Sequence, residues 1–283
     1  MFLPTYTRDE LKFAYTYRVY LRWQTYRLRH VAGTHKLSRS DVRVIGAKYG
    51  IRILRAEWDD TDFIVMASLK PTETVSACAS KLKGQLSKRL REFADTDAPI
   101  LGKGYFACTL GENTEDAVEK YLARQDAHHG YANRVRSPVL TITPNPEANH
   151  LQPAHARAYV HLHVVLVTWR RKGVFASPES RPVFEHWESL QEAKRFVIRK
   201  ASFLPDHVHL AIQIHPSVNP SALVTDLMNA AQDLMHHELP ESLIRAGVDR
   251  LWQPSAYFGS FGQLREGELR KYLDDWRDSH RAL

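Results

Sequence analysis

The sequence predicts an α+β fold made of two small α/β sandwich domains in tandem. The chain of 283 residues repeats its own pattern of apolar positions about 145 residues later. Within each copy, strand-like and helix-like segments alternate, which favours a sheet with helices packed on it. A proline-rich stretch separates the copies and suits a semi-rigid connector. We therefore predict domains at 1–136 and 157–283, joined by a linker at 137–156.

Three matches in the same order support the duplication. Residues 59–71 (DDTDFIVMASLKP) share their apolar positions and closing proline with residues 204–216 (LPDHVHLAIQIHP), 145 residues later. The segment YTYRVYLRW, ending at Trp23, is matched to HLHVVLVTW, ending at Trp169, 146 residues later. A third match aligns GYFACTLGENTEDAVEKYLARQ with AYFGSFGQLREGELRKYLDDW, with one residue deleted. Nearly constant spacing indicates a tandem duplication.

Each copy is expected to run strand, helix, strand, helix, short strand, last helix. In the second copy an apolar strand around 160–169 precedes a helical stretch at 178–196, and a second strand follows around His207 and His209. The next helix begins at the cap-like pair Asn219–Pro220, because asparagine caps helices and proline suits their first turn. The short strand lies in LWQPSAYFGSFG, where we expect Tyr257 and Phe258 to pack in the core, like Tyr105 and Phe106 in the first copy.

Composition narrows the class of protein. The formal net charge is +7 and the sequence pI is about 9.3, which favours a polyanionic partner such as nucleic acid. The two cysteines form no CxxC motif, so a disulfide scaffold and a cysteine-rich zinc site are excluded. The start of the sequence does not resemble a signal peptide, and no run of 18 apolar residues occurs. We expect a cytoplasmic protein without a membrane partner.

A histidine pair stands in the strand of the second repeat. His207 and His209 are two residues apart, so both imidazoles point to the same face of a strand and are able to hold one divalent metal ion. A pair of structural histidines on a sheet face is the alternative. Asp206 is expected to orient or cap this strand. A second H-x-H, His161 and His163, lacks the preceding Pro-Asp and is not expected to bind metal.

Several motifs together resemble the IS200/IS605-type single-tyrosine (Y1) transposases of the HUH nuclease superfamily. They are PDHVH, LWQPSAYFGSFG followed by LRKYLDDW, the lysine-glycine helix SKLKGQLSKRLREF, and VEKYLARQ. The resemblance implies ferredoxin-like domains and a homodimer, here fused into one monomeric pseudo-dimer. It also implies cutting and rejoining of single-stranded DNA, with hairpin recognition, through a 5′-phosphotyrosine intermediate. Mg²⁺ or Mn²⁺ would be held by two histidines and a polar residue on the tyrosine's helix, in a site shared between subunits.

The first copy keeps one half of such a site. Tyr121 matches the nucleophile and Gln125 the third metal ligand, and their i, i+4 spacing places both on one helix face. The histidine positions hold Asp62 and Ile64 instead. The Ile64 side chain has no atom that can bind a metal ion. Asp62 is therefore left without a second ligand beside it, and we take Asp62 as structural.

The second copy keeps the other half. It has His207 and His209, and Tyr272 at the tyrosine position, but Trp276 replaces the glutamine and offers no lone pair. If the last helices are exchanged between copies, the histidines meet Tyr121 and Gln125 and form one complete site. The other site then combines Asp62 and Ile64 with Tyr272 and Trp276 and is inactive. In the competing interpretation Tyr272 is the nucleophile within its own copy, with Asp275 or water completing the metal shell.

Basic residues near these motifs are candidate DNA contacts, because single-stranded nucleic acid is bound by basic and aromatic side chains. The candidates are Arg18, Arg22, Arg27, Lys81, Lys83, Lys88, Arg89, Arg170 and Arg171. Two other functions stay open. A DNA-hairpin-binding regulator or domesticated nickase would need less than a full pair of sites, and a metal-dependent hydrolase using water would not need Tyr121.

Overall fold

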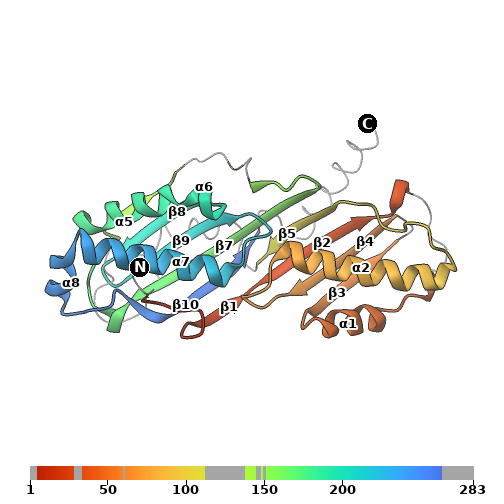
Figure 1. Cartoon of the computed structure of the whole chain (residues 1–283), viewed down its shortest axis with the longest axis horizontal. Helices are drawn as coiled ribbons and strands as arrows, with labels where there is room; N and C mark the ends of the chain where they lie inside the picture. The colour runs from red at the N-terminus through yellow and green to blue at the C-terminus, as the bar shows by residue number, and fades with distance from the viewer. Residues whose placement is uncertain are drawn as a thin grey trace.

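The computed structural model describes residues 5–28, 34–59, 61–111, 138–144, 148 and 151–262 (Figure 1). The first half contains β1 (Lys12–Thr16), β2 (Arg18–Gln24), η1 (Tyr26–Leu28), η2 (Thr34–Lys36), α1 (Arg39–Lys48), β3 (Arg52–Trp58), β4 (Asp62–Ser68), α2 (Val75–Ala94) and β5 (Tyr105–Leu110). The second half contains β7 (Ala156–Thr168), η4 (Trp169–Arg171), α5 (Ser177–Ser189), α6 (Gln191–Lys194), β8 (Phe196–Leu204), β9 (His207–Ile214), α7 (Pro220–His237), α8 (Pro240–Ala246) and β10 (Trp252–Phe261). Strand β6 (Leu140–Ile142) lies between them.

Each half is a ferredoxin-like βαββαβ unit. The first follows β2, α1, β3, β4, α2 and β5, with sheet order β3-β4-β2-β5. The second follows β7, α5, β8, β9, α7 and β10, with β7 lying between β9 and β10. The predicted fold class, two α/β sandwich units in tandem, is confirmed.

The two sheets join into one through reciprocal strand pairs. The start of β7 pairs in parallel with β5 of the first half, while the rest of β7 pairs antiparallel with β10 (Figure 1). In the same way β1 of the first half pairs in parallel with β10 of the second. Each half therefore contributes a strand to the edge of the other.

Hydrogen bonds between the halves are reciprocal as well. The backbone N–H of Ser76 donates to the carbonyl of Pro216 at 2.9 Å, and the N–H of Ser221 donates to the carbonyl of Pro71 at 3.1 Å. Both Pro71 and Pro216, and Ser76 and Ser221, are 145 residues apart. A contact of residue i with j′ matched by one of j with i′ is the signature of a two-fold interface.

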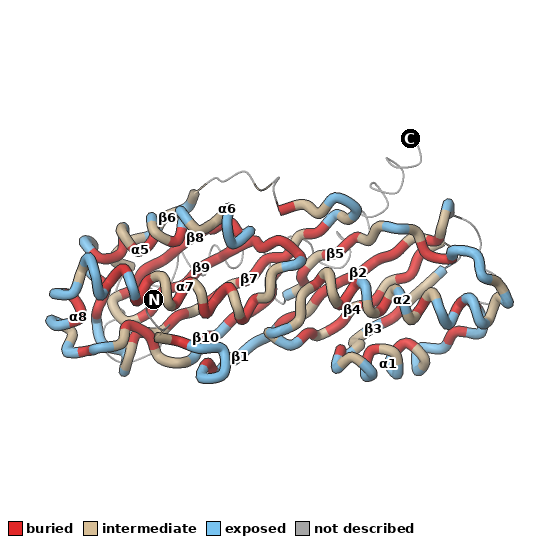
Figure 2. Tube along the Cα trace, in the orientation of Figure 1, coloured by how far each residue is buried: buried red, intermediate tan, exposed pale blue. Residues whose placement is uncertain are grey.

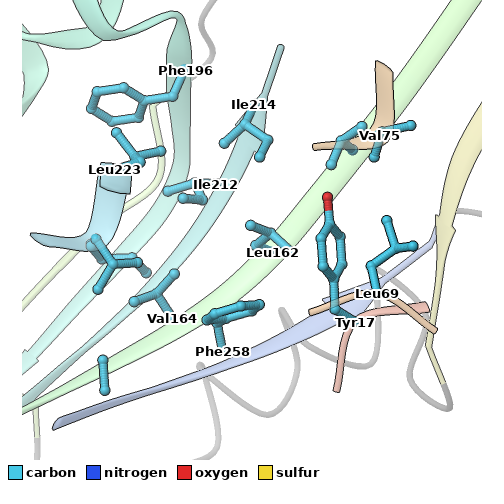
Figure 3. Packing of buried hydrophobic residues seen from close by; sticks show 14 of the residues in the cluster. Tyr17, Leu69, Val75, Leu162, Val164, Phe196, Ile212, Ile214, Leu223 and Phe258 are labelled. Atoms are coloured by element: carbon cyan, nitrogen blue, oxygen red, sulfur yellow. The ribbon is translucent and has the colours of Figure 1, made fainter. Parts of the chain in front are cut away.

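The hydrophobic core runs through the join without interruption. Tyr17 of the first half meets Phe258 of the second edge-on, with ring centroids 6.0 Å apart, close to Leu162 (Figure 3). Figure 2 shows buried positions following the strands across both halves. The apolar cores of the two halves are thus continuous.

Helices cover one face of the sheet (Figure 1). Apolar residues of α2 recur at i, i+3, i+4 and i+7, so one stripe is buried against the strands. The helix begins where Thr74 Oγ1 accepts a hydrogen bond from the N–H of Ala77. In α7 the Asn219 side chain caps the first turn and Pro220 opens the helix, as predicted.

Strands β3, β6 and β8 were not predicted from the sequence, and β1 was not predicted as a separate strand. β3 and β8 each precede the strand that holds the histidine positions, and the helical stretch predicted at 178–196 ends at Lys194 as α5 and α6. β3 lies at the sheet edge with charged, exposed residues, and β8 carries a bulge between Ile198 and Lys200, so neither alternates regularly. The predicted last helix of each copy lies outside the described residues. Within the predicted linker, β6 pairs with β8.

One part of the repeat alignment is shifted. Trp23 lies opposite Phe63, and Leu166 lies opposite Val208, so Trp23 corresponds to Leu166 rather than to Trp169. The turns that follow these strands support this correspondence. Arg27 in η1 has φ 56° and ψ 32°, and Arg170 in η4, 143 residues later, has φ 52° and ψ 28°. The match of two tryptophans had moved the alignment by three residues.

Candidate active site

The β8–β9 hairpin places both histidines of the PDHVH motif. Pro205 and Asp206 form the turn, and β9 begins at His207. Val208 points into the core, so His207 and His209 lie together on the opposite face, as strand alternation requires. Their ring centroids are 4.9 Å apart, and the residues are only 8% and 4% exposed. Two imidazoles therefore share one partly enclosed face.

A carboxylate holds the first imidazole. Asp206 Oδ1 lies 2.7 Å from Nδ1 of His207, and its Oδ2 lies 3.2 Å from Nη1 of Arg171. Burial acts to raise the pKa of Asp206, but the hydrogen bond and charge of His207, with the charge of Arg171, bring the pKa below its ordinary value. Asp206 is thus ionised at neutral pH, and its carboxylate is placed to orient the ring of His207.

A third histidine contacts the second imidazole. His163 Nε2, on β7, lies 2.9 Å from Nδ1 of His209, and the rings stack with centroids 5.1 Å apart and planes at 12°. Burial lowers the pKa of His163 to about 4, so the ring is neutral at pH 7. The sequence had given the His161–His163 pair no role. A correct register for β7 beside β9 would have revealed this contact.

An aromatic side chain borders the cluster. The ring of Tyr257 lies edge-on to His163 at 6.2 Å, and Tyr257 is 40% exposed. It lies along Gly259, where an added Cβ would come 2.6 Å from the Tyr257 hydroxyl. The expectation that Tyr257 packs in the core is therefore wrong, although its neighbour Phe258 is fully buried. Alternation alone places these two residues on opposite faces.

The equivalent positions of the first half carry different chemistry. Asp62 forms two hydrogen bonds with Arg22, from Nε to Oδ1 and from Nη2 to Oδ2, both 2.8 Å long. Both side chains are 4% exposed. Ile64 packs in an apolar cluster with Phe106 and Tyr20. Tyr20 occupies the strand position in the first half that His163 occupies in the second. A buried ion pair and apolar packing thus replace the imidazoles.

The candidate DNA contacts of the first half differ in exposure. Arg22 is buried in the ion pair described above, whereas Arg27 is exposed with its guanidinium over the ring of Tyr26. The side chain of Arg18 is partly buried on β2. Arg27 therefore presents its charge at the end of the sheet and Arg22 does not.

Other candidates lie on α2 and η4. Lys81 pairs with Glu73 at 2.7 Å, and Lys83 donates to the carbonyl of Lys103 at 2.7 Å, with its pKa lowered by burial. Lys88 and Arg89 are exposed on the same helix. Arg170 and Arg171, in the turn beside the histidines, are exposed too. Arg171 is connected to His207 through the carboxylate of Asp206.

Four residues of the predicted sites lie outside the described residues: Tyr121, Gln125, Tyr272 and Trp276, together with the alternative ligand Asp275. Within the described ranges, no group of three or more His, Cys, Asp or Glu side chains is arranged to hold a metal ion. The described part of the site is therefore the histidine pair with its outer hydrogen bonds.

Comparison with models of known protein families finds one family that matches both halves of the chain. The model of the family "Transposase IS200 like" matches residues 13–125 and 156–275. The two segments cover well over half of the sequence, so the chain belongs to the IS200-like transposase family. This confirms the resemblance drawn from the motifs and identifies a transposase-type enzyme that processes DNA.

Two solved structures show distant likeness. A protein assigned as a transposase from Deinococcus radiodurans R1 has 18% sequence identity and a TM-score of 0.31, with the match covering 40% of this chain and 92% of that one. A mutant of the ferredoxin protease FusC in complex with Arabidopsis ferredoxin has 9% identity and a TM-score of 0.18, covering 94% of this chain and 50% of that one. No curated protein matches the chain. Across the described residues, no helix has the length and apolar character needed to cross a membrane.

Proposed function

We propose that the chain is a divalent-metal-dependent transesterase that nicks and rejoins single-stranded DNA. The observation that carries this proposal is the arrangement of His207 and His209 in a member of the IS200-like transposase family. Both Nδ1 atoms lie within hydrogen-bond distance of an outer partner, Asp206 or His163. Imidazoles that are held in this way bind metals through Nε2 in a fixed orientation.

The donor set fits a small hard ion once oxygen ligands join it. Two imidazoles supply nitrogen, and Mg²⁺ or Mn²⁺ needs further oxygen ligands. We assign one of these to the side-chain amide of Gln125, and others to the DNA phosphate and water. When bound, the ion polarises the scissile phosphate and offsets the charge that develops on it.

Tyr121 is the nucleophile in this proposal. Its hydroxyl oxygen attacks the phosphorus, the bond from phosphorus to the 3′ oxygen breaks, and the phenol proton ends on that oxygen. The products are a 5′-phosphotyrosine and a free 3′-OH. A 3′-OH that attacks the phosphotyrosine reverses these steps and joins two strands.

The site is proposed to be composite, within one chain that acts as a pseudo-dimer. The reciprocal pairs of β5 with β7 and of β10 with β1 support a duplication with domains at 1–136 and 157–283. The Asp62–Arg22 ion pair supports the assignment of the first half as the source of nucleophile and amide only. Tyr272 as nucleophile of its own half is the competing assignment.

A second function is favoured by one observation. The histidine positions of the first half hold Asp62, in a structural ion pair with Arg22, and the apolar Ile64. A chain that binds DNA hairpins without cutting them would need no metal ligands at these positions. In both cases the exposed Arg170 and Arg171 are the proposed contacts to the phosphates nearest the histidines, with Arg27 in the matching turn of the first half.

The test is the formation of a covalent protein–DNA adduct. Single-stranded hairpin DNA from the gene's own flanks is incubated with Mn²⁺ or with EDTA and resolved on a denaturing gel. We expect an adduct with the wild type in Mn²⁺, and none in EDTA or with His207→Ala. The exposed His155 provides the control, since His155→Ala should form the adduct normally. Adduct formation by His207→Ala at the wild-type level contradicts the proposal, and DNA binding without any adduct favours the hairpin-binding function.

A further inference from the structure

We propose that His163 is a positioning residue, which holds the ring of His209 so that its Nε2 faces the metal. The inference rests on the proposed function. His163 comes from β7, the strand beside β9, and its Nε2 lies 2.9 Å from His209 Nδ1. Its ring is nearly parallel to that of His209, with planes at 12°. The contact therefore fixes both the position and the tilt of the His209 ring.

The direction of this hydrogen bond follows from proton accounting. A neutral imidazole carries one proton on its two nitrogens. If His209 binds metal through Nε2, its proton is on Nδ1, which then donates to Nε2 of His163. His163 is the acceptor and carries its own proton on Nδ1. Any side chain that offers an acceptor at this place can perform the same function, whereas an apolar ring cannot.

The two histidines of the strand are thus supported differently. His207 donates to the carboxylate of Asp206, which is itself held by Arg171, while His209 relies on a neutral imidazole. Outer hydrogen bonds of this kind orient a ligand and tune its basicity, and their loss typically weakens metal binding about 10- to 100-fold.

The first half supplies an internal comparison. Tyr20 lies opposite Met66 on β4, and His163 lies opposite Ala211 on β9. Met66 and Ala211 are 145 residues apart, so Tyr20 and His163 occupy equivalent strand positions. Tyr20 packs with Phe106 and Ile64 in an apolar cluster. In the second half, where the neighbouring strand carries His209, this position is His163. In the first half, where the neighbouring strand carries Ile64, it is Tyr20. A purely structural role in the sheet would not require this coincidence.

The test measures Mn²⁺ binding by the full-length chain, from the electron paramagnetic resonance signal of the free ion. His163→Phe keeps a ring but removes the acceptor, and His163→Gln keeps an acceptor in its amide oxygen. We expect Mn²⁺ binding about 10- to 100-fold weaker with His163→Phe, and within about 3-fold of the wild type with His163→Gln. Tyr20→Phe is the control at the equivalent position and should leave Mn²⁺ binding unchanged.

The outcomes separate this inference from the proposed function. If His209→Ala weakens binding but His163→Phe does not, the positioning role is wrong and the metal site stands. If His163→Gln binds as weakly as His163→Phe, the hydrogen bond is not the reason and the inference is overturned. A wild type that does not bind Mn²⁺ would remove the metal-dependent function and this inference with it. Thermal unfolding of each variant verifies that it is folded.

Discussion

The Arg22–Asp62 ion pair allows a test of whether a structural contact occupies the histidine position in the first half. Its two hydrogen bonds are both 2.8 Å long and both side chains are 4% exposed. Arg22→Met or Asp62→Leu alone leaves the remaining charge buried without its partner. Losses of this kind cost about 3–5 kcal/mol. Since domains are stable by only about 5–15 kcal/mol, either change should remove a large part of the stability.

The double variant is expected to behave differently. When both partners become apolar, no charge is left in the interior, and such replacements are often neutral or stabilising. We therefore expect the unfolding free energy of the double variant to lie within about 2 kcal/mol of the wild type. It should also form the covalent DNA adduct, because the pair is structural and lies outside the proposed active site.

Urea unfolding followed by tryptophan fluorescence measures these free energies. An exposed pair provides the control: Arg89 and Glu92 lie 3.1 Å apart on α2, and Arg89→Met should change stability by less than about 1 kcal/mol. If Arg22→Met also costs less than about 1 kcal/mol, the pair is not a structural replacement and the reasoning fails. Loss of the adduct in a folded double variant would place the pair in the active site.

Two further predictions concern stability elsewhere in the chain. Burial acts to raise the pKa of Glu179, but its hydrogen bonds, first that from Ser242, lower it below 4.5. The stability that Glu179 contributes to the folded state is therefore fully present above the pKa that this residue has in the unfolded chain. It is lost as the pH falls through the lower pKa of the folded state. Glu179→Gln should cost about 1.5–3 kcal/mol at pH 7 and less at pH 3 in urea unfolding, and an equal cost at both would contradict this. A Cβ on Gly46 would lie 2.5 Å from Cγ1 of Ile53, so Gly46→Ala should lower the free energy of unfolding by about 1–3 kcal/mol. Gly84 has open space around it, so Gly84→Ala should cause no loss of stability. Similar melting temperatures for the two variants would contradict this prediction.

Much of the fold was accessible from the sequence because its pattern of apolar positions recurs about 145 residues later. The alternation in residues 59–71 and 204–216 identified β4 and β9, and the Asn219–Pro220 pair identified the start of α7. β3 and β8 were missed for physical reasons. Charged residues at the edge of the sheet and a bulge within β8 both disturb the period of two that marks a strand.

The histidine pair was predictable, but its surroundings were not. His207 and His209 are two residues apart on one strand, so a local rule places them on one face. The contact of His163 with His209 depends on the register between β7 and β9, which no local pattern fixes. The same register determines that Arg22 meets Asp62 across β2 and β4.

The central claim is that the nucleophile and the histidines come from different halves. The most direct measurement compares Tyr121→Phe with Tyr272→Phe for the covalent adduct on single-stranded hairpin DNA in Mn²⁺. The composite site predicts that Tyr121→Phe abolishes the adduct while Tyr272→Phe retains it. An adduct that is lost with Tyr272→Phe and retained with Tyr121→Phe would contradict the claim and place all of the chemistry in the second half.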